Sequence, residues 1–437
     1  METLSAFLER NLLSDPQDHD RTEIEKISRA MADALNQQPS SMPMLPTYLS
    51  VSNQIEENKP VIVLDAGGTN LRVALVTIRN QGAIEECFAK YPMPGTQGPM
   101  NKEEFFDAVA EKIIPLCERS NVISFCFSYL TEPLPDHDAV VTSLCKEIHI
   151  EGIAGAHVCA ELAKALRRLG ITKAFEFYLL NDSVASVLGG ISELNPSEAY
   201  DGNVGLIWGT GFNICYSEDT DIVPTAFFYP FDSMLINTEA GDYDGFAQGD
   251  ADAALDRQSM QPGLHQAEKM IGGGYLGDLI VQVIRAGAKE QLLPAAFAEI
   301  GKLDLREVDL LLSNNMTHML PECTEEDIRI VKEIILAVYR RAARLVAYML
   351  AAVAQRIKKD RSDAKIAVIA DGSTLLKSEY LMNTLNQYCE AFCAPQNIRI
   401  DLIPSSNVIL KGTAYAALLE TNEGYIPGRT AVTGKAI

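Results

Sequence analysis

Two short turns rich in glycine and threonine interrupt apolar, β-branched stretches of this sequence, and turns of this kind can bind anions. Residues 67–70 (GGTN) follow VIVLDA and precede LRVALVTI, while residues 209–211 (GTG) follow NVGLIW and precede FNICYSE. Glycine lets backbone N–H groups approach phosphate oxygens, and it accepts the positive φ angles that such a turn needs. An ordinary hairpin would explain either turn alone, but the presence of two favours phosphate binding.

The carboxylate of Asp65 lies at the mouth of the first turn, where it could hold a magnesium ion through water. Residues 71–78 read as a strand, so this turn is neither a dinucleotide fingerprint nor a P-loop, because both of those open a helix. The formal net charge of -22 argues against a nucleic acid partner, since clustered Lys and Arg must meet the phosphate backbone. A phosphorylated ligand would therefore need local help from backbone amides, a few cations and a metal.

A third candidate is the segment 177–190 (FYLLNDSVASVLGG), where a predicted strand ends at Asn181 and Asp182 and a helix of small residues begins. Asp and Ser are common helix N-caps, and a capping role is one interpretation of this pattern. The other makes Asp182 a general base, which accepts a hydroxyl proton while the oxygen attacks a γ-phosphoryl group. Ligands of α/β folds bind beyond the carboxyl ends of strands, and this position favours the catalytic role.

Asn213, Glu239 and Glu268 stand in loop-like or strand-end settings, in the segments GTGFNICY, LINTEAGDYD and HQAEKMIGGGYLGD. Isolated glutamates are usually solvated surface residues. Brought together in a cleft, two carboxylates and an amide would instead exchange hydrogen bonds with successive hydroxyls of a sugar. Such a site rejects an analogue that lacks one hydroxyl by as much as about 10⁴- to 10⁵-fold, because its own buried polar groups would go unpaired.

Hydrophobic periodicity predicts the elements that must position these residues. In the first half, the predicted strands are 61–66, 71–78, 83–91, 122–128 and 174–180, and the predicted helices are 101–118, 155–169 and 183–194. Residues 203–218 repeat the opening pattern of strand, glycine turn and strand, which indicates duplicated domains that face one another. The remainder is predicted to be mostly helical, with a long helix over 324–359 that opens on a near capping box (TEED) and a final strand at 365–370. Before the first strand, a helical N-terminus over 1–36 and a proline-rich linker over 39–46 are expected.

Length and composition bound the class of protein. A chain of 437 residues exceeds the size at which single cores stop growing, so two domains with a cleft between them are expected. The nine cysteines are scattered and odd in number, which favours reduced thiols and a cytoplasmic location. The N-terminus mixes acidic and basic residues, so no signal peptide is expected, and the apolar stretch 345–355 is shorter than the roughly 20 residues of a membrane span.

Taken in order, these motifs resemble those of the hexokinase family. LDAGGTNLRV is similar to that family's phosphate-binding signature, and VGLIWGTGFNICY resembles its second phosphate loop. FCFSYL is similar to the sugar-binding Ser-Phe-Pro segment, LCKEI to the Thr-Lys pair, and LLNDSVAS to the loop that bears the catalytic aspartate. LINTEAGDYD and QPGLHQAEKMIGGGYLGD resemble the two glutamate motifs. The order and spacing match from about residue 43 to 280, and more thinly to 420.

The resemblance implies an α/β protein with the actin-like ATPase fold, in which two ribonuclease-H-like domains surround a central cleft. A small domain is expected over 58–190, with the C-terminal helix at about 413–437 returning to it. A large domain is expected over 191–412, with the N-terminal helix 1–45 packing on it. The implied partners are a small-molecule hexose and a nucleotide, with no nucleic acid and no membrane, and the chain is expected to be a monomer or a homodimer.

The resemblance also implies a reaction, in which the γ-phosphoryl group of Mg-ATP passes to the 6-hydroxyl of a hexose, with glucose as the expected substrate. Asp182 would be the catalytic base, and Lys146 would bind the sugar and steady the developing charge. The residues implied to hold the hexose are Ser128, Lys146, Asn181, Asp182, Asn213, Glu239 and Glu268. The residues implied to surround the phosphates of ATP and the Mg²⁺ ion are Asp65, Gly67, Gly68, Thr69, Asn70, Arg72, Gly209, Thr210 and Gly211, with Gly372 and Ser373 near the adenosine.

The sequence departs from the family pattern at several positions. The Phe-Pro of the sugar segment is Tyr-Leu at 129–130, the Thr of the Thr-Lys pair is Cys145, and the Trp usual after the first glutamate is Ala240. The C-terminal nucleotide loop, SSNVILKGTAYAAL, retains only a Lys-Gly pair at 411–412. The zinc-binding cysteine motif of the bacterial repressor-kinase sugar kinases is absent, which argues against that neighbouring family.

These departures leave two alternatives to an active kinase. One is a hexokinase-like sugar sensor that is catalytically weak or inactive. The other is an actin-like or chaperone-type ATPase that binds no sugar, which would leave the two glutamate motifs without a role. Retention of Asp65, Asp182 and Lys146 favours the kinase, because a sensor needs no general base.

Overall fold

The computed structural model describes residues 3–14, 20–51, 55–80, 82–143, 148, 150–191, 193–194, 197–224, 231–313 and 320–419. The chain folds into two compact units, each assembled from segments that are far apart in the sequence. Unit 1 comprises Met1–Met44, Ala199–Ile214 and Thr238–Pro404, and unit 2 comprises Leu45–Glu198, Cys215–Asn237 and Ser405–Ile437. The domain boundaries predicted at residues 58, 190 and 412 stay a prediction.

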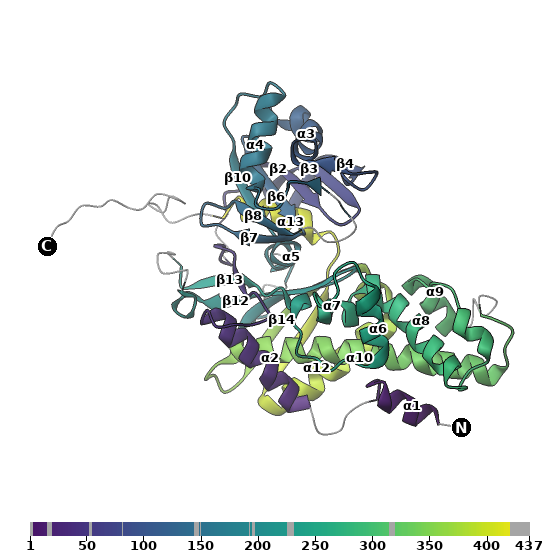
Figure 1. Cartoon of the computed structure of the whole chain (residues 1–437). Helices are drawn as coiled ribbons and strands as arrows, with labels where there is room; N and C mark the ends of the chain where they lie inside the picture. The colour runs from purple at the N-terminus through teal and green to yellow at the C-terminus, as the bar shows by residue number, and fades with distance from the viewer. Residues whose placement is uncertain are drawn as a thin grey trace. The chain divides into compact units, whose positions relative to one another are not determined.

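A five-stranded sheet with the order β10-β6-β2-β3-β4 forms the centre of unit 2 (Figure 1). The strands are β2 (Pro60–Ala66), β3 (Asn70–Arg79), β4 (Gly82–Pro92), β6 (Val122–Phe127) and β10 (Glu176–Leu180). β10, β6 and β2 run parallel, whereas β3 and β4 extend the sheet antiparallel. Every residue of β6 is buried, as expected for a central strand that is covered on both faces, while most of the edge strand β4 is exposed.

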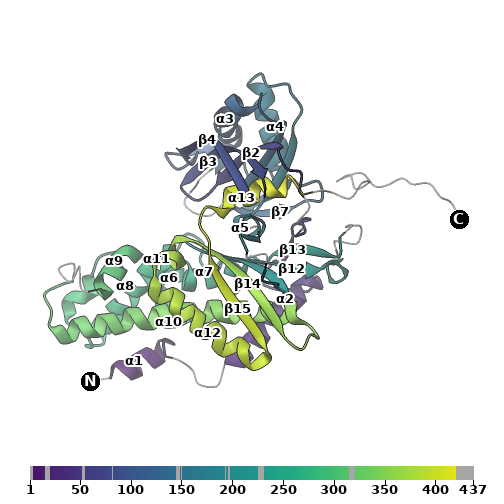
Figure 2. The same ribbon diagram turned by 180° about the vertical axis from the view of Figure 1, so that it is seen from behind.

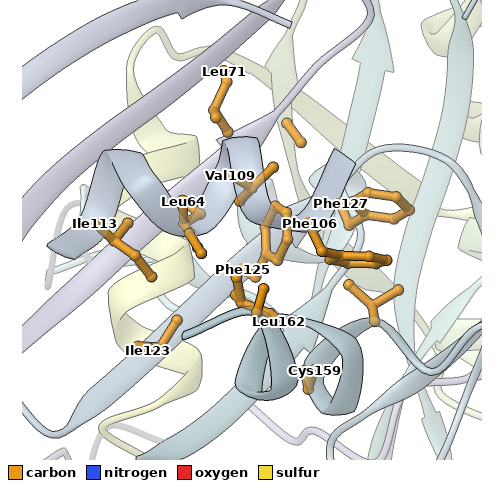
Figure 3. Close-up of a cluster of buried hydrophobic side chains, with 14 of the residues drawn as sticks. Leu64, Leu71, Phe106, Val109, Ile113, Ile123, Phe125, Phe127, Cys159 and Leu162 are labelled. Carbon is orange, nitrogen blue, oxygen red and sulfur yellow. The ribbon is translucent and has the colours of Figure 1, made fainter. Parts of the chain in front are cut away.

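Helices α3 (Lys102–Ile113) and α4 (Val158–Arg168) pack on one face of this sheet. Their apolar faces meet the strand residues in one fully buried cluster (Figure 3). Its members include Leu64, Leu71, Phe106, Val109, Ile113, Ile123, Phe125, Phe127 and Leu162. This cluster holds the three parallel strands in fixed register, and their carboxyl ends carry candidate site residues.

Helix α13 (Val408–Ala416) contacts the sheet at β2, β3 and β6, and it packs in turn against α5 (Asp182–Ile191). A Cβ at Gly412 would lie 1.8 Å from the carbonyl oxygen of Ala185, and a Cβ at Gly189 would lie 2.2 Å from that of Val408. Only glycine fits at both contacts. Two smaller sheets also belong to unit 2: β5 (Met100–Asn101) with β9 (Ile150–Glu151), and β7 (Leu130–Pro133) with β8 (Ala139–Ser143).

The second sheet has the order β1-β13-β12-β11-β14-β15. Its strands are β1 (Leu45–Pro46), β11 (Gly202–Trp208), β12 (Phe212–Asp219), β13 (Ser233–Asn237), β14 (Ala364–Asp371) and β15 (Ile398–Pro404). β11, β14 and β15 are parallel, and β12 and β13 pair antiparallel. The order β13-β12-β11-β14-β15 repeats the order β4-β3-β2-β6-β10, with a glycine turn after β2 and after β11. The predicted duplication of strand, glycine turn and strand is confirmed.

The rest of unit 1 is mostly helical, as predicted. The long helix α10 (Glu325–Lys358) is contacted by α2 (Asp20–Leu35), α8 (Gly273–Lys289) and α12 (Glu379–Cys393) (Figures 1 and 2). The capping box is confirmed: the carboxylate of Asp327 accepts from Thr324 N–H at 2.8 Å, and Thr324 Oγ1 accepts from Asp327 N–H at 3.2 Å. The shorter helices are α1 (Leu4–Arg10), η4 (Ala240–Asp242), α6 (Asp250–Gln258), α7 (Gln266–Ile271), η5 (Ala295–Glu299), α9 (Leu305–Leu312), α11 (Ser373–Lys377) and η7 (Ala394–Gln396).

Some sequence expectations were wrong or incomplete. The predicted linker 39–46 ends in β1, because its last two residues pair with β13. The expected C-terminal helix is only partly described: α13 ends at Ala416, and residues 420–437 lie outside the described part of the chain. The apolar stretch 345–355 is buried within α10, and among the described helices none has both the length and the apolar character that a membrane crossing needs. The eight cysteines in the described ranges are free thiols.

Candidate active site

The first glycine turn joins β2 to β3 in unit 2. The N–H of Gly67 donates to the carbonyl of Asn70 at 3.1 Å, which closes the turn, and no described residue accepts a hydrogen bond from the N–H groups of Gly68 or Thr69. Two backbone donors of this kind suit the oxygens of a phosphate group. The expected positive φ is wrong, because neither glycine of the turn has a left-handed backbone. Glycine therefore contributes here by leaving the backbone uncovered.

Two side chains hold the first turn in place. Tyr129 Oη donates to the carbonyl of Gly67 at 3.0 Å, and its buried ring packs on Phe127 with ring centroids 4.9 Å apart. Arg72, the cross-strand partner of Asp65, donates from Nη1 to Asp65 Oδ2 at 3.0 Å. Asp65 is 6% exposed, so its carboxylate is held at the base of the turn. Sequence reasoning treated Tyr129 only as a departure from the sugar segment and missed this anchoring contact.

The carboxyl ends of β2, β6 and β10 bring further candidates to one edge of the same sheet. Ser128 directly follows β6, and Asn181 directly follows β10. Cys126 pairs in register with Asp65 on one side and with the last residue of β10 on the other, so Asp65 and Asp182 start from strands about 10 Å apart. Burial, reinforced by these two carboxylates, raises the pKa of the Cys126 thiol well above its usual value. The thiol therefore stays protonated.

The hydrogen bonds in the first turn of α5 show which residue caps this helix. Asn181 Oδ1 accepts from the N–H of Ser183 at 2.9 Å and from its hydroxyl at 2.8 Å, and the carbonyl of Asn181 accepts from Ala185 N–H at 3.0 Å. The N-cap is thus Asn181, which corrects the interpretation that Asp182 or Ser183 caps this helix. Asp182 is half-buried, and none of the capping hydrogen bonds uses its carboxylate.

The second glycine turn, 209–211 in unit 1, packs against two other glycine-containing segments. The N–H groups of Gly273 and Gly274, at the start of α8, donate to the carbonyls of Gly209 and Thr210 at 2.9 Å each. Thr374 Oγ1 also donates to the carbonyl of Gly209, at 2.7 Å. Sequence reasoning gave these three partners no role, although the GGG run within a glutamate motif was a signal that could have been used.

Gly372 and Ser373, predicted to lie near the adenosine, stand beside the second turn. A Cβ at Gly372 would be 2.3 Å from the carbonyl carbon of Trp208, and its φ is +117°, so only glycine fits there. A Cβ at Gly209 would lie 3.7 Å from the backbone nitrogen of Ser373. The expected positive φ is wrong again for Gly209 and for Gly211. Close packing explains why residue 211 is glycine, because a Cβ at this position would lie 2.5 Å from the carboxylate of Glu268.

Three residues that were predicted to bind sugar lie close to one another in unit 1. Glu268 Oε2 accepts from the backbone N–H of Phe212 at 2.9 Å, and the neighbouring side chain of Asn213 accepts from Ala240 N–H at 3.3 Å. Glu239 directly precedes Ala240 and has a left-handed backbone with a φ of +49°. A non-glycine residue in this conformation is uncommon and is held by its surroundings. The Glu268 carboxylate and the Asn213 amide thus lie beside the second glycine turn, and the backbone of Glu239 adjoins the Asn213 amide through Ala240.

Other predicted residues are not placed. Lys146 and Cys145 lie outside the described residues, so the proposed sugar contact of the one and the departure at the other stay predictions. The other candidates divide between the two units. Unit 2 carries the first turn with Asp65, Asn70 and Arg72, and also Ser128, Asn181 and Asp182. Unit 1 carries the second turn, Asn213, Glu239, Glu268, Gly372 and Ser373.

The donor set fits a metal that arrives with a nucleotide better than a resident metal. Among the described residues, no group of three or more His, Cys, Asp or Glu side chains could hold a metal ion. Asp65 offers one carboxylate next to the first turn, with Arg72 beside it. Mg²⁺ keeps several waters and is commonly bound by one or two carboxylates together with substrate phosphates. Asp65 can therefore take part in holding Mg²⁺ through water.

Two family models described as hexokinase match this chain, one over residues 11–191 and the other over residues 203–419. Hexokinase-1 of Schizosaccharomyces pombe is 31% identical over 264 residues, which cover 57% of this chain and 54% of that protein. Hexokinase-3 of Mus musculus is 29% identical over 384 residues, which cover 80% of this chain and 40% of that protein. The chain spans about half, or less, of the length of these curated relatives.

Solved structures show the same fold. A hexokinase from Schistosoma mansoni complexed with glucose matches with a TM-score of 0.78 at 24% identity, covering 95% of this chain and 98% of that one. A second crystal structure of a hexokinase matches with a TM-score of 0.68 at 20% identity, covering 94% of this chain and 98% of that one. The fold is accordingly that of two actin-like ATPase domains, which explains the repeated strand order. The family models, which together account for residues 11–191 and 203–419, show that the chain belongs to the hexokinase family.

Proposed function

We propose that the protein is a hexokinase, which transfers the γ-phosphoryl group of ATP to the 6-hydroxyl of a hexose to give hexose 6-phosphate. Family membership supports this activity, and the glucose bound to the Schistosoma mansoni hexokinase makes glucose the first substrate to test. One observation carries the proposal. Asp182 stands just beyond the end of β10, next to an edge that also bears Asp65, while Asn181 takes over the helix cap.

Asp182 is the proposed general base. Its carboxylate would accept the proton of the 6-hydroxyl as that oxygen attacks the γ-phosphorus, and the bond to the ADP oxygen breaks in the same displacement. Lys146 is proposed to bind the sugar and to steady the charge that develops. Asn213, Glu239 and Glu268 are proposed to hold the other hydroxyls, with help from Ser128 and Asn181.

The backbone of the two glycine turns is proposed to hold the phosphates of ATP, with Gly372 and Ser373 near the adenosine. In the first turn, the N–H groups of Gly68 and Thr69 donate to no other described residue, which leaves them available to phosphate oxygens. Mg²⁺, held through water by Asp65, would neutralise the charge that develops on the phosphoryl oxygens. ATP and Mg²⁺ are therefore the proposed cosubstrate and metal.

Water resembles a sugar hydroxyl and is far more abundant, so an enzyme of this kind must limit hydrolysis of ATP. We expect hexose binding to promote closure of the fold, which assembles the site and excludes water. ATP hydrolysis in the absence of hexose should therefore be much slower than hexose phosphorylation. We expect the protein to be a monomer or a homodimer in the cytoplasm. We expect it to bind neither nucleic acid nor membrane.

Asp182→Asn tests the proposal, because it keeps the size of the side chain and removes the base. A coupled assay of glucose 6-phosphate should show turnover reduced by about 10²- to 10⁴-fold. The fluorescence of Trp208, the one tryptophan in the sequence, should still report glucose binding, since its buried indole donates to the Ile271 carbonyl at 2.8 Å next to the second turn. Asp107→Asn is the control, because Asp107 is a partly exposed residue of α3 that pairs with Arg168 and has no proposed role in the site.

The outcomes separate the alternatives. An Asp182→Asn enzyme with nearly normal turnover would refute the assigned base. A wild-type protein that binds glucose but forms no product with any nucleoside triphosphate would be the sugar sensor. A protein that hydrolyses ATP and responds to no hexose or N-acetylhexosamine in a panel would be an ATPase of another kind.

A further inference from the structure

An ion pair joins the two segments that carry Glu239 and Glu268. Asp242 is the last residue of η4, whose first residue follows Glu239, and His265 directly precedes α7, whose first turn carries Glu268. His265 Nδ1 and Asp242 Oδ1 are in direct hydrogen-bond contact. The His265 side chain is 17% exposed and that of Asp242 is 20% exposed, so solvent screens this pair only weakly.

The surroundings of the imidazole suit its charged form. The other ring nitrogen, Nε2, lies 3.1 Å from Oε1 of Gln261, so oxygen atoms face both nitrogens of His265. An imidazolium donates from both nitrogens and satisfies both oxygens, whereas the neutral ring has only one N–H to donate. Loss of the proton removes the donor at Nε2, and the Gln261 amide must then turn over before its NH₂ group can donate to the ring.

Electrostatics act in the same direction. The hydrogen bond to Asp242 is the largest cause that raises the pKa of His265 above its ordinary value of 6.5, and the charges of Asp242 and Glu268 add to it, while burial and Lys269 oppose it. Lys269 is itself paired with Asp256 of α6 at 2.5 Å. Other charged pairs on the helices packed against α7 are Asp252 with Arg341, Asp278 with Lys302, and Glu326 with Arg329.

The pair lies one turn of backbone from each glutamate. The N–H of Asp242 donates to the carbonyl of Glu239 at 3.0 Å, and the carbonyl of His265 accepts from the N–H of Lys269, which directly follows Glu268. Glu239 also has a left-handed backbone, a conformation that needs support from its surroundings. A change at either end of the pair is therefore passed to a glutamate through a single hydrogen-bonded turn.

We propose that His265 and Asp242 are positioning residues, which fix Glu239 relative to Glu268 and thereby make hexose affinity depend on pH. This inference rests on the proposed function, because it takes a hexose to be the ligand of the two glutamates. The paired, charged state holds both segments in the geometry that binds sugar. When the histidine loses its proton the tie weakens, and the glutamates sample positions that bind sugar less well.

Glucose affinity should fall as the pH rises, because His265 pairs with Asp242 in its protonated state. The contribution of the pair is complete below about pH 6.5 and is lost as the pH rises through the raised pKa of His265. For a partly buried, charge-assisted hydrogen bond, the glucose Kd should rise by about three- to tenfold between pH 6.5 and pH 9. The turnover number at saturating glucose should change less, because the pair touches neither reacting group.

The test uses the full chain and a titration of Trp208 fluorescence with glucose, without nucleotide, at a series of pH values. His265→Gln should give a glucose Kd that no longer depends on pH in this range. Asp242→Asn should move the midpoint of the pH dependence to lower pH, because the carboxylate that favours the imidazolium is gone. His157→Gln, at a histidine of unit 2 whose side chain is 54% exposed, should keep the wild-type pH dependence.

Thermal melting checks that each variant is folded, and if His265→Gln fails to fold, the midpoint of Asp242→Asn decides. The inference is wrong if His265→Gln keeps the wild-type pH dependence, or if Asp242→Asn leaves the midpoint unchanged. Glucose binding by the wild type together with such a result would overturn this inference and leave the proposed function standing. A wild type that responds to no hexose at any pH would overturn both.

Discussion

Gly211→Ala tests whether the packing of the second glycine turn sets the position of Glu268. A Cβ at this glycine would lie 2.5 Å from Glu268 Oε2, and ordinary contact begins at 3.4 Å, so the oxygen must move by about 0.9 Å. The same oxygen accepts the N–H of Phe212 at 2.9 Å, and this hydrogen bond would be lengthened or lost. Because the obstructing atom is the end of a flexible side chain, the clash is relieved by moving Glu268 and not the backbone.

The magnitude follows from the hydrogen bond that a displaced Glu268 could no longer make to the sugar. A hydrogen bond to a charged group contributes about 1.5–3 kcal/mol, and the half-buried position of Glu268 favours the lower end. At about 1.4 kcal/mol for each factor of ten, the glucose Kd should rise by roughly tenfold. The assay is a titration of Trp208 fluorescence with glucose, and thermal melting should show only a small loss of stability.

Gly209→Ala is the matched control in the same turn. Its Cβ would meet Gly372 Cα at 3.5 Å, an ordinary contact, and neither Gly209 nor Gly211 has a left-handed backbone that alanine would resist. The glucose Kd of this variant should stay close to that of the wild type, although its ATP affinity can change. Wild-type glucose affinity in Gly211→Ala, or equal weakening in both variants, would refute the reasoning.

Three other predictions concern unit 2. Tyr129→Phe keeps the ring and removes the hydrogen bond to the Gly67 carbonyl. The KM for ATP in the coupled assay should therefore rise by about two- to tenfold, while the glucose Kd stays unchanged. An unchanged KM for ATP would contradict the anchoring role of Tyr129. Gly412→Ala places a Cβ 1.8 Å from a backbone carbonyl oxygen of α5, so urea unfolding should show a free energy of unfolding lower by about 2 kcal/mol or more. Gly301→Ala is the control and should keep the wild-type stability, because no atom lies within 4 Å of its Cβ. Burial lowers the pKa of His137 to about 4, so wild-type stability should fall by about 2–3 kcal/mol as the pH drops from 6.5 towards 4, and His137→Asn should remove most of that fall in denaturant titrations.

Much of the fold could be predicted because its signals are local. The alternation and β-branching of β2 and β3, the capping box at Thr324 and the repeated strand, glycine turn and strand are patterns within a few neighbouring residues. The strands β13 and β15 and the hairpin β7–β8 were not predicted. β15 is an edge strand and β7 belongs to a two-stranded sheet, and most residues of both strands are only partly buried or exposed. Their alternation of apolar and polar residues is therefore weaker than that of a central strand.

Sequence reasoning proposed the residues of the candidate site, and the structure corrects two of the contacts that were expected of them. The glycines of both turns were expected to supply positive φ angles, but the turns close with ordinary backbone angles, and at Gly211 the requirement is space for Glu268. The pattern Asn-Asp-Ser before α5 allowed several capping residues. Only the observed hydrogen bonds of Asn181 left Asp182 available for catalysis.

The sequence by itself determined the two glycine turns, the order of the motifs and hence the family, because each of these depends on residues close together in the chain. The tertiary structure alone decided which distant groups meet: Tyr129 with Gly67, Gly273 with Gly209, and His265 with Asp242. Such contacts depend on strand order and helix packing across many residues. Local spacing cannot specify them, because the same turn or helix end could be packed against many different partners.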